Sequence, residues 1–124
     1  MNTLDPSYRV ALQRMQGVLV AALPSFVTPA LLLQLRRDVL GATAGAALRG
    51  VLLDASAVEV MDALDFRSLC QTAQMCRVMG RPAIVCGLTP GVVSSLVDLD
   101  VDAHAVETAR DVESGLSQIV ARSR

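Results

Sequence analysis

The chain has 124 residues, of which 52% are hydrophobic and 19% are charged, and its formal net charge is −1. This length suits one ordinary domain with a sizeable core and is too short for two. The near-neutral charge argues against nucleic-acid binding and against a polybasic membrane contact. With only three aromatic residues, the chain also lacks the material for a base-stacking platform.

Signals for export, membrane insertion or metal binding are missing from the sequence. Residues 1–9 lack the apolar segment of a signal peptide, and every apolar run is far shorter than the roughly 18 residues of a membrane span. Cys70, Cys76 and Cys86 show no C-x-x-C spacing, which favours buried thiols in a reduced compartment. A single histidine, His104, does not complete a zinc ligand set. We therefore expect a cytoplasmic protein without metal, cofactor or membrane segment.

The N-terminal part predicts two strands, over Val10–Met15 and Gly17–Leu23. Gly17 separates them and predicts a tight turn, so the first strand should join an edge of the sheet as part of a hairpin. Residues 18–23 are continuously apolar, as expected for a strand that is buried on both faces.

A helix is predicted next, over Ala30–Leu40. Thr28 is a favourable N-cap, and Pro29 suits the first helical position. Gly41 is expected to end the helix. The residues that share its apolar face are Leu31, Leu32, Leu35 and Val39.

The rest of the chain alternates between strands and helices. The predicted strands are Gly50–Asp54, Ala83–Cys86 and, more weakly, Ala103–Glu107. The predicted helices are Asp62–Met79, ended by Gly80, a helix after Thr89-Pro90 that carries Val92, Val93, Leu96 and Val97, and a last helix capped by Asp111 with Val112, Leu116, Ile119 and Val120 inward. The order β-β-α-β-α-β-α-β-α implies an α/β fold, with a mainly parallel, mixed sheet of about five strands and about four covering helices.

The second helix has the clearest start signal. Asp62 can accept hydrogen bonds from the backbone N–H groups of Leu64 or Asp65. Asp65 itself resembles the second half of a capping box. Both carboxylates also favour the positive end of the helix dipole, by about 0.3–1 kcal/mol each.

This helix has apolar residues on two sides. At about 100° per residue, the core side comprises Phe66, Leu69, Cys70, Ala73 and Cys76. The opposite side carries Leu64, Met75, Val78 and Met79, with Ser68 and Gln71 among them. Exposed apolar clusters tend to mark partner surfaces. A protein partner is the expected cover, and the alternative is a helix partly covered by the chain's own loops.

The segment 51–65 resembles the signature of STAS domains, the fold of anti-sigma-factor antagonists. That signature is an apolar strand ending in Asp, a Val four residues later, and then an Asp followed by a phosphorylatable Ser at a helix start. Asp54, Val58 and Asp62 match it. Further segments that resemble the family are 79–85, 87–92, 106–108 and 111–116, the last two being typical of the RsbS type. The resemblance implies one STAS domain over 1–124 with a core at about 10–121.

At one position the chain departs from the family pattern. The family's phosphorylatable Ser falls at position 63, where this chain has Ala63, which has no hydroxyl to accept phosphate. The residue is either an engineered change that locks the unphosphorylated state or a natural divergence. A second phosphorylation site is implied for the type, with Thr89 or Ser68 as candidates. Their alternative roles are an N-cap and an ordinary helix serine.

The resemblance also implies a function. RsbS-type proteins form homo- and hetero-oligomers with RsbR-type sensor paralogues in a large scaffold, the stressosome, which sequesters an RsbT-type serine/threonine kinase until phosphorylation releases it. From this resemblance, together with the outward apolar residues of the second helix, we expect the partner-binding residues to be Asp62, Leu64, Asp65, Met75, Val78 and Met79. An alternative is a simple anti-anti-sigma factor that binds an anti-sigma kinase directly.

Enzymatic alternatives fit the sequence poorly. The chain contains no Lys, so a P-loop lysine or a Schiff base is excluded. His104 lies in an acidic, weakly structured stretch and is expected at the surface. Caps and solvated loops explain the acidic groups at Asp62/Asp65 and Asp98/Asp100/Asp102. A phosphoacceptor receiver domain would suit Asp54, but its acidic pair after the first strand and its Lys are missing. We therefore expect a protein without enzymatic activity.

Overall fold

The computed structural model describes residues 10–45, 47–98 and 106–122. Within them one sheet has the strand order β1-β2-β3-β4-β5. The strands are β1 (Ala11–Met15), β2 (Val18–Ala22), β3 (Gly50–Asp54), β4 (Ala83–Cys86) and β5 (Glu107–Ala109), and the helices are α1 (Pro29–Gly45), α2 (Ala63–Val78), α3 (Pro90–Asp98) and α4 (Val112–Arg122). Only β1 is antiparallel to its neighbour. The predicted mixed α/β sheet is confirmed.

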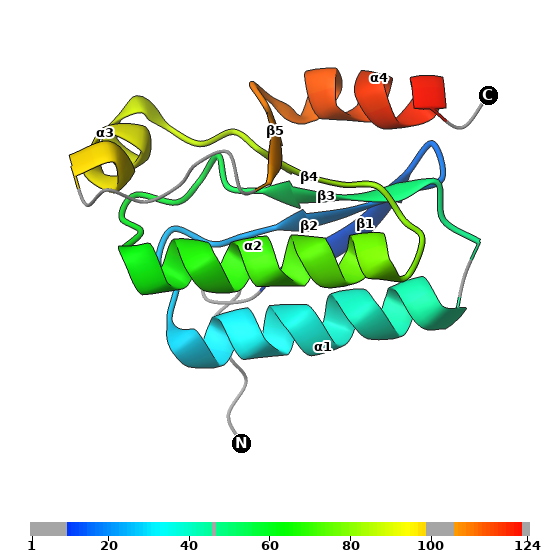
Figure 1. Ribbon diagram of the computed structural model, residues 1–124, viewed down its shortest axis with the longest axis horizontal. Helices are drawn as coiled ribbons and strands as arrows, with labels where there is room; N and C mark the ends of the chain where they lie inside the picture. Colours follow the sequence, from blue (N-terminus) through cyan, green and yellow to red (C-terminus); the bar gives the residue numbers. More distant parts are fainter. Residues whose placement is uncertain (1–9, 46, 99–105, 123–124) are drawn as a thin grey trace.

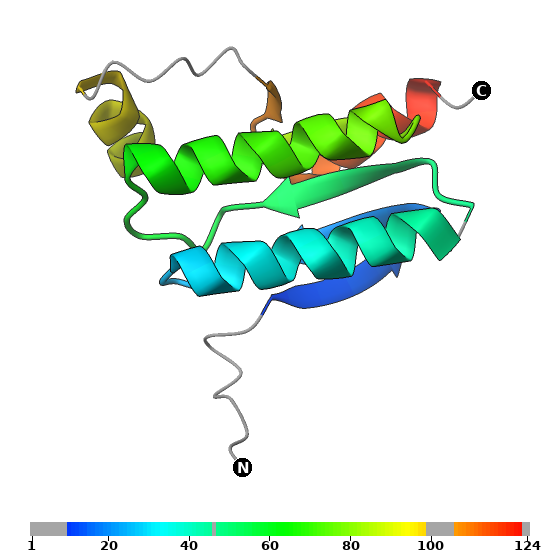
Figure 2. The same ribbon diagram turned by 60° about the horizontal axis from the view of Figure 1, so that its bottom comes forward.

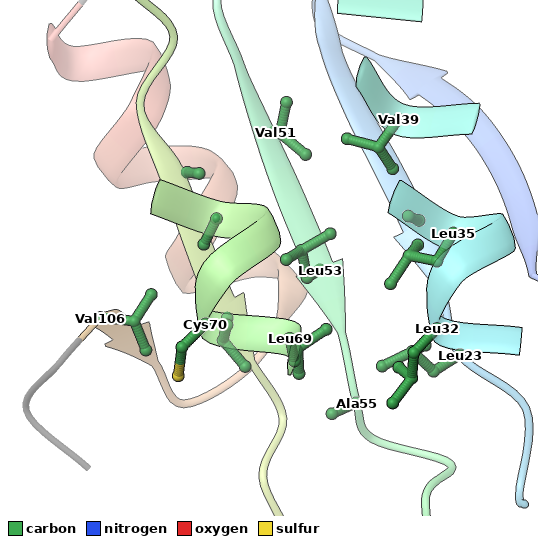
Figure 3. Packing of buried hydrophobic residues seen from close by; sticks show 14 of the residues in the cluster. Leu23, Leu32, Leu35, Val39, Val51, Leu53, Ala55, Leu69, Cys70 and Val106 are labelled. Carbon is green, nitrogen blue, oxygen red and sulfur yellow. The ribbon is translucent and has the colours of Figure 1, made fainter. Parts of the chain in front are cut away.

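Helices cover both faces of the sheet, with α1 and α2 side by side on one face and α4 on the other (Figures 1 and 2). Alternate residues of each central strand therefore point into two different cores. Val51 and Leu53 of β3 pack beneath α1 and α2, and Leu52 packs against α4. Figure 3 shows the first core from close by, with Leu35 and Leu69 facing the sheet. Burial on both faces explains why these strands are continuous apolar runs.

The predicted tight turn lies at Gln16-Gly17, between β1 and β2. Both residues have positive φ, 55° and 80°, and Met15 pairs with Val18 across the turn. Positive φ at both central positions is the signature of a type I′ turn, whose twist matches that of a hairpin. The turn therefore places β1 at the edge of the sheet, as predicted.

The predicted end of the first helix is wrong: α1 continues past Gly41 to Gly45. The reason lies in the core, where Thr43 is buried one turn after Val39 and its hydroxyl donates to the Val39 carbonyl oxygen at 2.7 Å. A glycine inside a helix costs only about 1 kcal/mol relative to alanine. Packing further along the helix offsets that cost.

The last strand also differs from its prediction. The predicted strand 103–107 begins in residues outside the described part of the chain, and β5 runs over Glu107–Ala109. Its register pairs Ile84 with Glu107. The Glu107 carboxylate accepts hydrogen bonds from the Arg122 guanidinium, which lower the pKa of Glu107 and raise that of Arg122. The described β5 has no continuous apolar pattern, and its first residue is held by an ion pair with α4. Hydrophobic periodicity therefore placed the strand too early in the sequence.

Buried thiols agree with the sequence prediction. Cys70, Cys76 and Cys86 are free and buried. Burial, with the nearby Asp54 carboxylate as a smaller cause, raises the pKa of the Cys86 thiol to about 12. Such a thiol stays protonated at neutral pH and is a poor nucleophile. Among the described residues, no helix has the length and apolar character to cross a membrane.

Close packing between β3 and its neighbours predicts a stability difference between two glycines. A Cβ at Gly50 would lie 2.7 Å from Ile119 Cγ2 and 2.9 Å from the Pro82 carbonyl oxygen. Gly50→Ala should lower the free energy of unfolding by about 1–3 kcal/mol because the core is overpacked. Gly91→Ala is the control, since nothing lies within 4 Å of its Cβ. It should leave stability unchanged or raise it by about 0.5 kcal/mol. Urea unfolding of both variants checks this, and equal effects would contradict it.

Candidate functional site

The start of α2 lies at the edge of the sheet where the parallel strands end (Figure 1). In open α/β sheets this edge, beyond the carboxyl ends of the strands, is where binding sites usually form. The connection from β3 is anchored there. Asp54 Oδ1 accepts from the Ser56 N–H at 3.0 Å, and Val58 and Met61 are buried. The chain therefore enters α2 along a fixed path.

The predicted capping box is present at this helix start. Asp62 Oδ1 accepts from the Asp65 N–H at 2.7 Å, and Asp65 Oδ2 accepts from the Asp62 N–H at 3.4 Å. The donor used is that of Asp65 rather than that of Leu64. Two backbone donors of the helix end are thus satisfied by two side chains.

The electrostatics of the cap disfavour further negative charge. Partial burial raises the pKa of Asp65, and the adjacent Asp62 carboxylate raises it further, while the Asp62 backbone N–H acts in the opposite direction. Two carboxylates already share this helix end. A third anionic group would add repulsion, against which the helix dipole contributes at most about 1 kcal/mol.

Ala63 is the first residue of α2 and is half-buried directly after the N-cap. Exposed apolar side chains flank it on both sides along the chain. Val60 is 69% exposed and Leu64 is 70% exposed. The position at which the family has its Ser therefore lies in a partly apolar surface next to two carboxylates.

Other exposed apolar side chains at the same end of the molecule were not predicted from the sequence. They come from the connection after β2 and from α3, which lies at the same end of the molecule as the start of α2 in both views (Figures 1 and 2). These exposed residues are Phe26, Val93 and Val97. We call them, with Val60 and Leu64, the carboxyl-edge rim. The signal was available, because α3 is apolar on more than one side: Val92 and Leu96 are buried while Val93 and Val97 are exposed.

The four apolar residues predicted on the outer side of α2 are all exposed, but they do not form one patch. Leu64 stands at the start of α2, whereas Met75, Val78 and Met79 stand at its end. Fourteen residues of helix separate Leu64 from Val78, or about 21 Å at 1.5 Å per residue. The latter three residues form a second surface, here called the α2 end.

Between the two surfaces, Arg36 of α1 binds the outer side of α2. Its Nε donates to Thr72 Oγ1 at 3.1 Å, and its Nη2 donates to the carbonyl oxygen and hydroxyl of Ser68 and to Gln71 Oε1 at 3.1 to 3.3 Å. All these acceptors are neutral. This bridge fixes α2 against α1 and involves Ser68, one of the two candidate second phosphorylation sites, in a part-buried contact.

The other candidate, Thr89, acts as an N-cap. Its Oγ1 accepts from the Val92 N–H at 3.4 Å at the start of α3. Asp98 ends α3. Asp100, Asp102 and His104, weighed in the sequence as possible catalytic groups, lie outside the described residues.

Comparison with known proteins identifies similar solved structures. A serine-to-glutamate variant of RsbS from Moorella thermoacetica is 25% identical, with a TM-score of 0.78 over 94% of this chain and 98% of its own. A chain from the stressosome, described as a signal integration and transduction hub, is 24% identical, with a TM-score of 0.73 over 92% of this chain and 99% of its own. An anti-sigma-factor antagonist (STAS) domain protein from Planctomyces limnophilus is 16% identical, with a TM-score of 0.70 over 90% of this chain and 98% of its own. No protein-family model and no curated protein sequence matches the chain.

These similarities extend over at least 90% of this chain, so they cover the sheet and its helices as a whole. The resemblance is therefore confirmed: the chain has the STAS fold of anti-sigma-factor antagonists and is similar to RsbS of the stressosome.

Proposed function

We propose that this chain is a non-enzymatic scaffold protein of bacterial stress signalling. It co-assembles with RsbR-type sensor paralogues into a stressosome and sequesters an RsbT-type serine/threonine kinase. The observation that carries the proposal is the start of α2, where Ala63 lies between a capping box and exposed apolar side chains, in a fold similar to RsbS. In this proposal the chain spans one STAS domain and acts in the cytoplasm.

The carboxyl-edge rim is the proposed docking surface for the kinase. Two of its apolar residues, Val60 and Leu64, lie on either side of the cap along the chain, so a partner that covers them also desolvates Asp62 and Asp65. A partner held in this way is sensitive to charge at position 63. Two unit charges about 6 Å apart at an effective dielectric of about 20 interact by roughly 3 kcal/mol. That energy corresponds to more than a hundredfold in affinity, since about 1.4 kcal/mol is tenfold.

The α2 end is the proposed contact with other subunits of the scaffold. Along the helix, Met75 lies about 16 Å and Val78 about 21 Å from Leu64. These distances are at least about twice the Debye length of about 8 Å at physiological ionic strength. A charge at position 63 therefore acts on the kinase surface and leaves the scaffold contact largely unaffected.

Ala63 defines the signalling state of this chain. Without a hydroxyl, position 63 stays neutral, and the chain keeps the kinase-binding form of the surface. A second phosphorylation site remains a prediction. Phosphate at Ser68 would meet the Arg36 guanidinium, and phosphate at Thr89 would compete with the α3 cap.

The first prediction restores the family residue. Ala63→Ser should make the chain a substrate for a cognate RsbT-type kinase, because the new hydroxyl lies at an accessible helix start. Intact-mass measurement after incubation with kinase and ATP should show one added phosphate. The unchanged chain is the control and should gain none at position 63. An unchanged mass of the variant would contradict the proposed switch position.

A second prediction separates the two surfaces. Met75→Glu should leave the fold intact and weaken assembly with an RsbR-type paralogue, because it buries an unpaired charge at the α2 end. Particle size in analytical ultracentrifugation measures this, with a megadalton particle expected for the unchanged chain. Gln118→Glu, at an exposed residue of α4, adds the same charge on the other face of the sheet and is the control. Unaltered particle size for Met75→Glu would remove the α2 end from the proposal.

The third prediction concerns the rim. Leu64→Glu should weaken kinase binding by about tenfold or more while leaving particle size unchanged, because it introduces a charge next to position 63. Calorimetric titration with the kinase measures this, with Met75→Glu as the matched variant that should bind normally. A one-to-one complex with an anti-sigma factor, and no large particle with the paralogue, would instead support a simple anti-anti-sigma factor.

A further inference from the structure

Among the described strands, β1 is an edge of the sheet and pairs only with β2. Four of its five residues, Ala11 to Arg14, are exposed. Leu12 is 41% exposed even though its strand neighbours in β2 are buried. An exposed strand edge offers a row of unpaired backbone groups to another strand.

The hairpin turn determines which backbone groups face outward. A two-residue turn makes the residues that flank it, Met15 and Val18, a hydrogen-bonded pair. Such pairs alternate along an antiparallel ladder. The backbone groups of Gln13 therefore face β2, while those of Leu12 and Arg14 point away from the sheet and are available to a new strand.

A groove lies beside this edge. It has a volume of about 300 Å³ and is lined by Arg14, Leu19, Gly41, Ala42, Gly45 and Leu48. A Cβ built on Gly41 or Gly45 would have nothing within 4 Å, so the helix wall of the groove is open. Arg14 pairs with Leu19, and Leu12 pairs with Ala21. Leu19 and Ala21 both belong to the core beneath α1. Leu12 and Arg14 therefore project on the face of the sheet that carries the groove.

We propose that β1 pairs with β1 of a second copy of this chain, antiparallel about a two-fold axis at Gln13. Only outward-facing residues can exchange hydrogen bonds across the new ladder, and this register pairs Leu12 of one copy with Arg14 of the other, twice. About four backbone hydrogen bonds form in this way. Each Leu12 then lies opposite Arg14 of the second copy. Because Arg14 lines the groove, the Leu12 side chain packs against the aliphatic part of this arginine and against the groove of the second copy.

Charge and symmetry favour a second copy over other occupants. Arg14 is the one charged residue of β1, and the two-fold register places it opposite an apolar side chain and not opposite another cation. The contact is isologous, so it closes and leaves no free β1 edge. Pairing of β1 with β5 of a second copy is less favourable, because β5 has three residues and its Glu107 carboxylate is already bound by Arg122.

The self-pairing is independent of the proposed function, since it uses neither the carboxyl-edge rim nor the α2 end. It is therefore tested on the full chain alone, without paralogue or kinase. Failure of this test would leave the kinase and paralogue experiments unaffected, and their failure would leave this one unaffected. If both hold, each chain contributes a pairing edge and two further surfaces to an assembly.

Two opposite charges at one position test the register. Leu12→Arg places an arginine opposite Arg14 of the second copy at two symmetric sites, and should raise the dimer dissociation constant by about tenfold or more. Leu12→Glu removes the same apolar side chain but places a carboxylate opposite that arginine, and should retain the dimer. Leu33→Arg, at an exposed leucine of α1, is the control and should leave the dimer dissociation constant unchanged.

Sedimentation velocity measures the dimer over a concentration series reaching about 200 µM, because small interfaces bind weakly. Circular dichroism and thermal unfolding verify that each variant is folded. A dimer lost in Leu12→Arg and kept in Leu12→Glu and Leu33→Arg supports the proposal. A monomer at every concentration, a ladder of larger species, a dimer that tolerates Leu12→Arg, or equal loss in both Leu12 variants overturns it.

Discussion

The reciprocal hydrogen bonds between Asp62 and Asp65 determine where α2 begins, and the remaining features of the candidate site depend on that start. Because Val58 and Met61 anchor the preceding connection in the core, the cap cannot slide along the chain. Position 63 is thereby held at the edge where the parallel strands end. A capping substitution of this kind typically costs about 1 kcal/mol. Its larger consequence is positional, since a shift of one residue would turn Leu64 by about 100° away from the rim.

The geometry of α2 divides the apolar surface of the chain by distance. One end carries Leu64 beside the cap, and the other end carries Val78, with the Arg36 bridge between them. Charge at the cap is strongly felt by groups within a few ångströms and is screened at the far end. One rigid helix can thus carry one surface whose binding depends on the charge at position 63 and a second surface whose binding does not. In a scaffold, such a division would allow a bound kinase to leave without dismantling the particle.

Local signals explain what the sequence could predict. The hairpin, the strands buried on both faces and the Asp62 cap depend on residues within a few positions of each other, and the structure has all of them. Features that depend on distant residues were missed. The continuation of α1 through Gly41 depends on burial of Thr43, and the Arg36 bridge joins residues 32 to 36 positions apart. The helical periodicity also placed Leu64 and Val78 on the same side of α2. It did not account for the rise along the helix, which puts them at opposite ends.

The central claim is that charge at position 63 controls a docked kinase. Ala63→Glu and Ala63→Gln introduce side chains of nearly equal size, and only glutamate adds a third carboxylate beside Asp62 and Asp65. The dissociation constant of an RsbT-type kinase, measured by calorimetry for both variants at low and physiological salt, isolates the charge. We predict that the Ala63→Glu variant binds at least about tenfold more weakly than the Ala63→Gln variant, with a larger difference at low salt. Equal affinities at both salt concentrations would contradict the account.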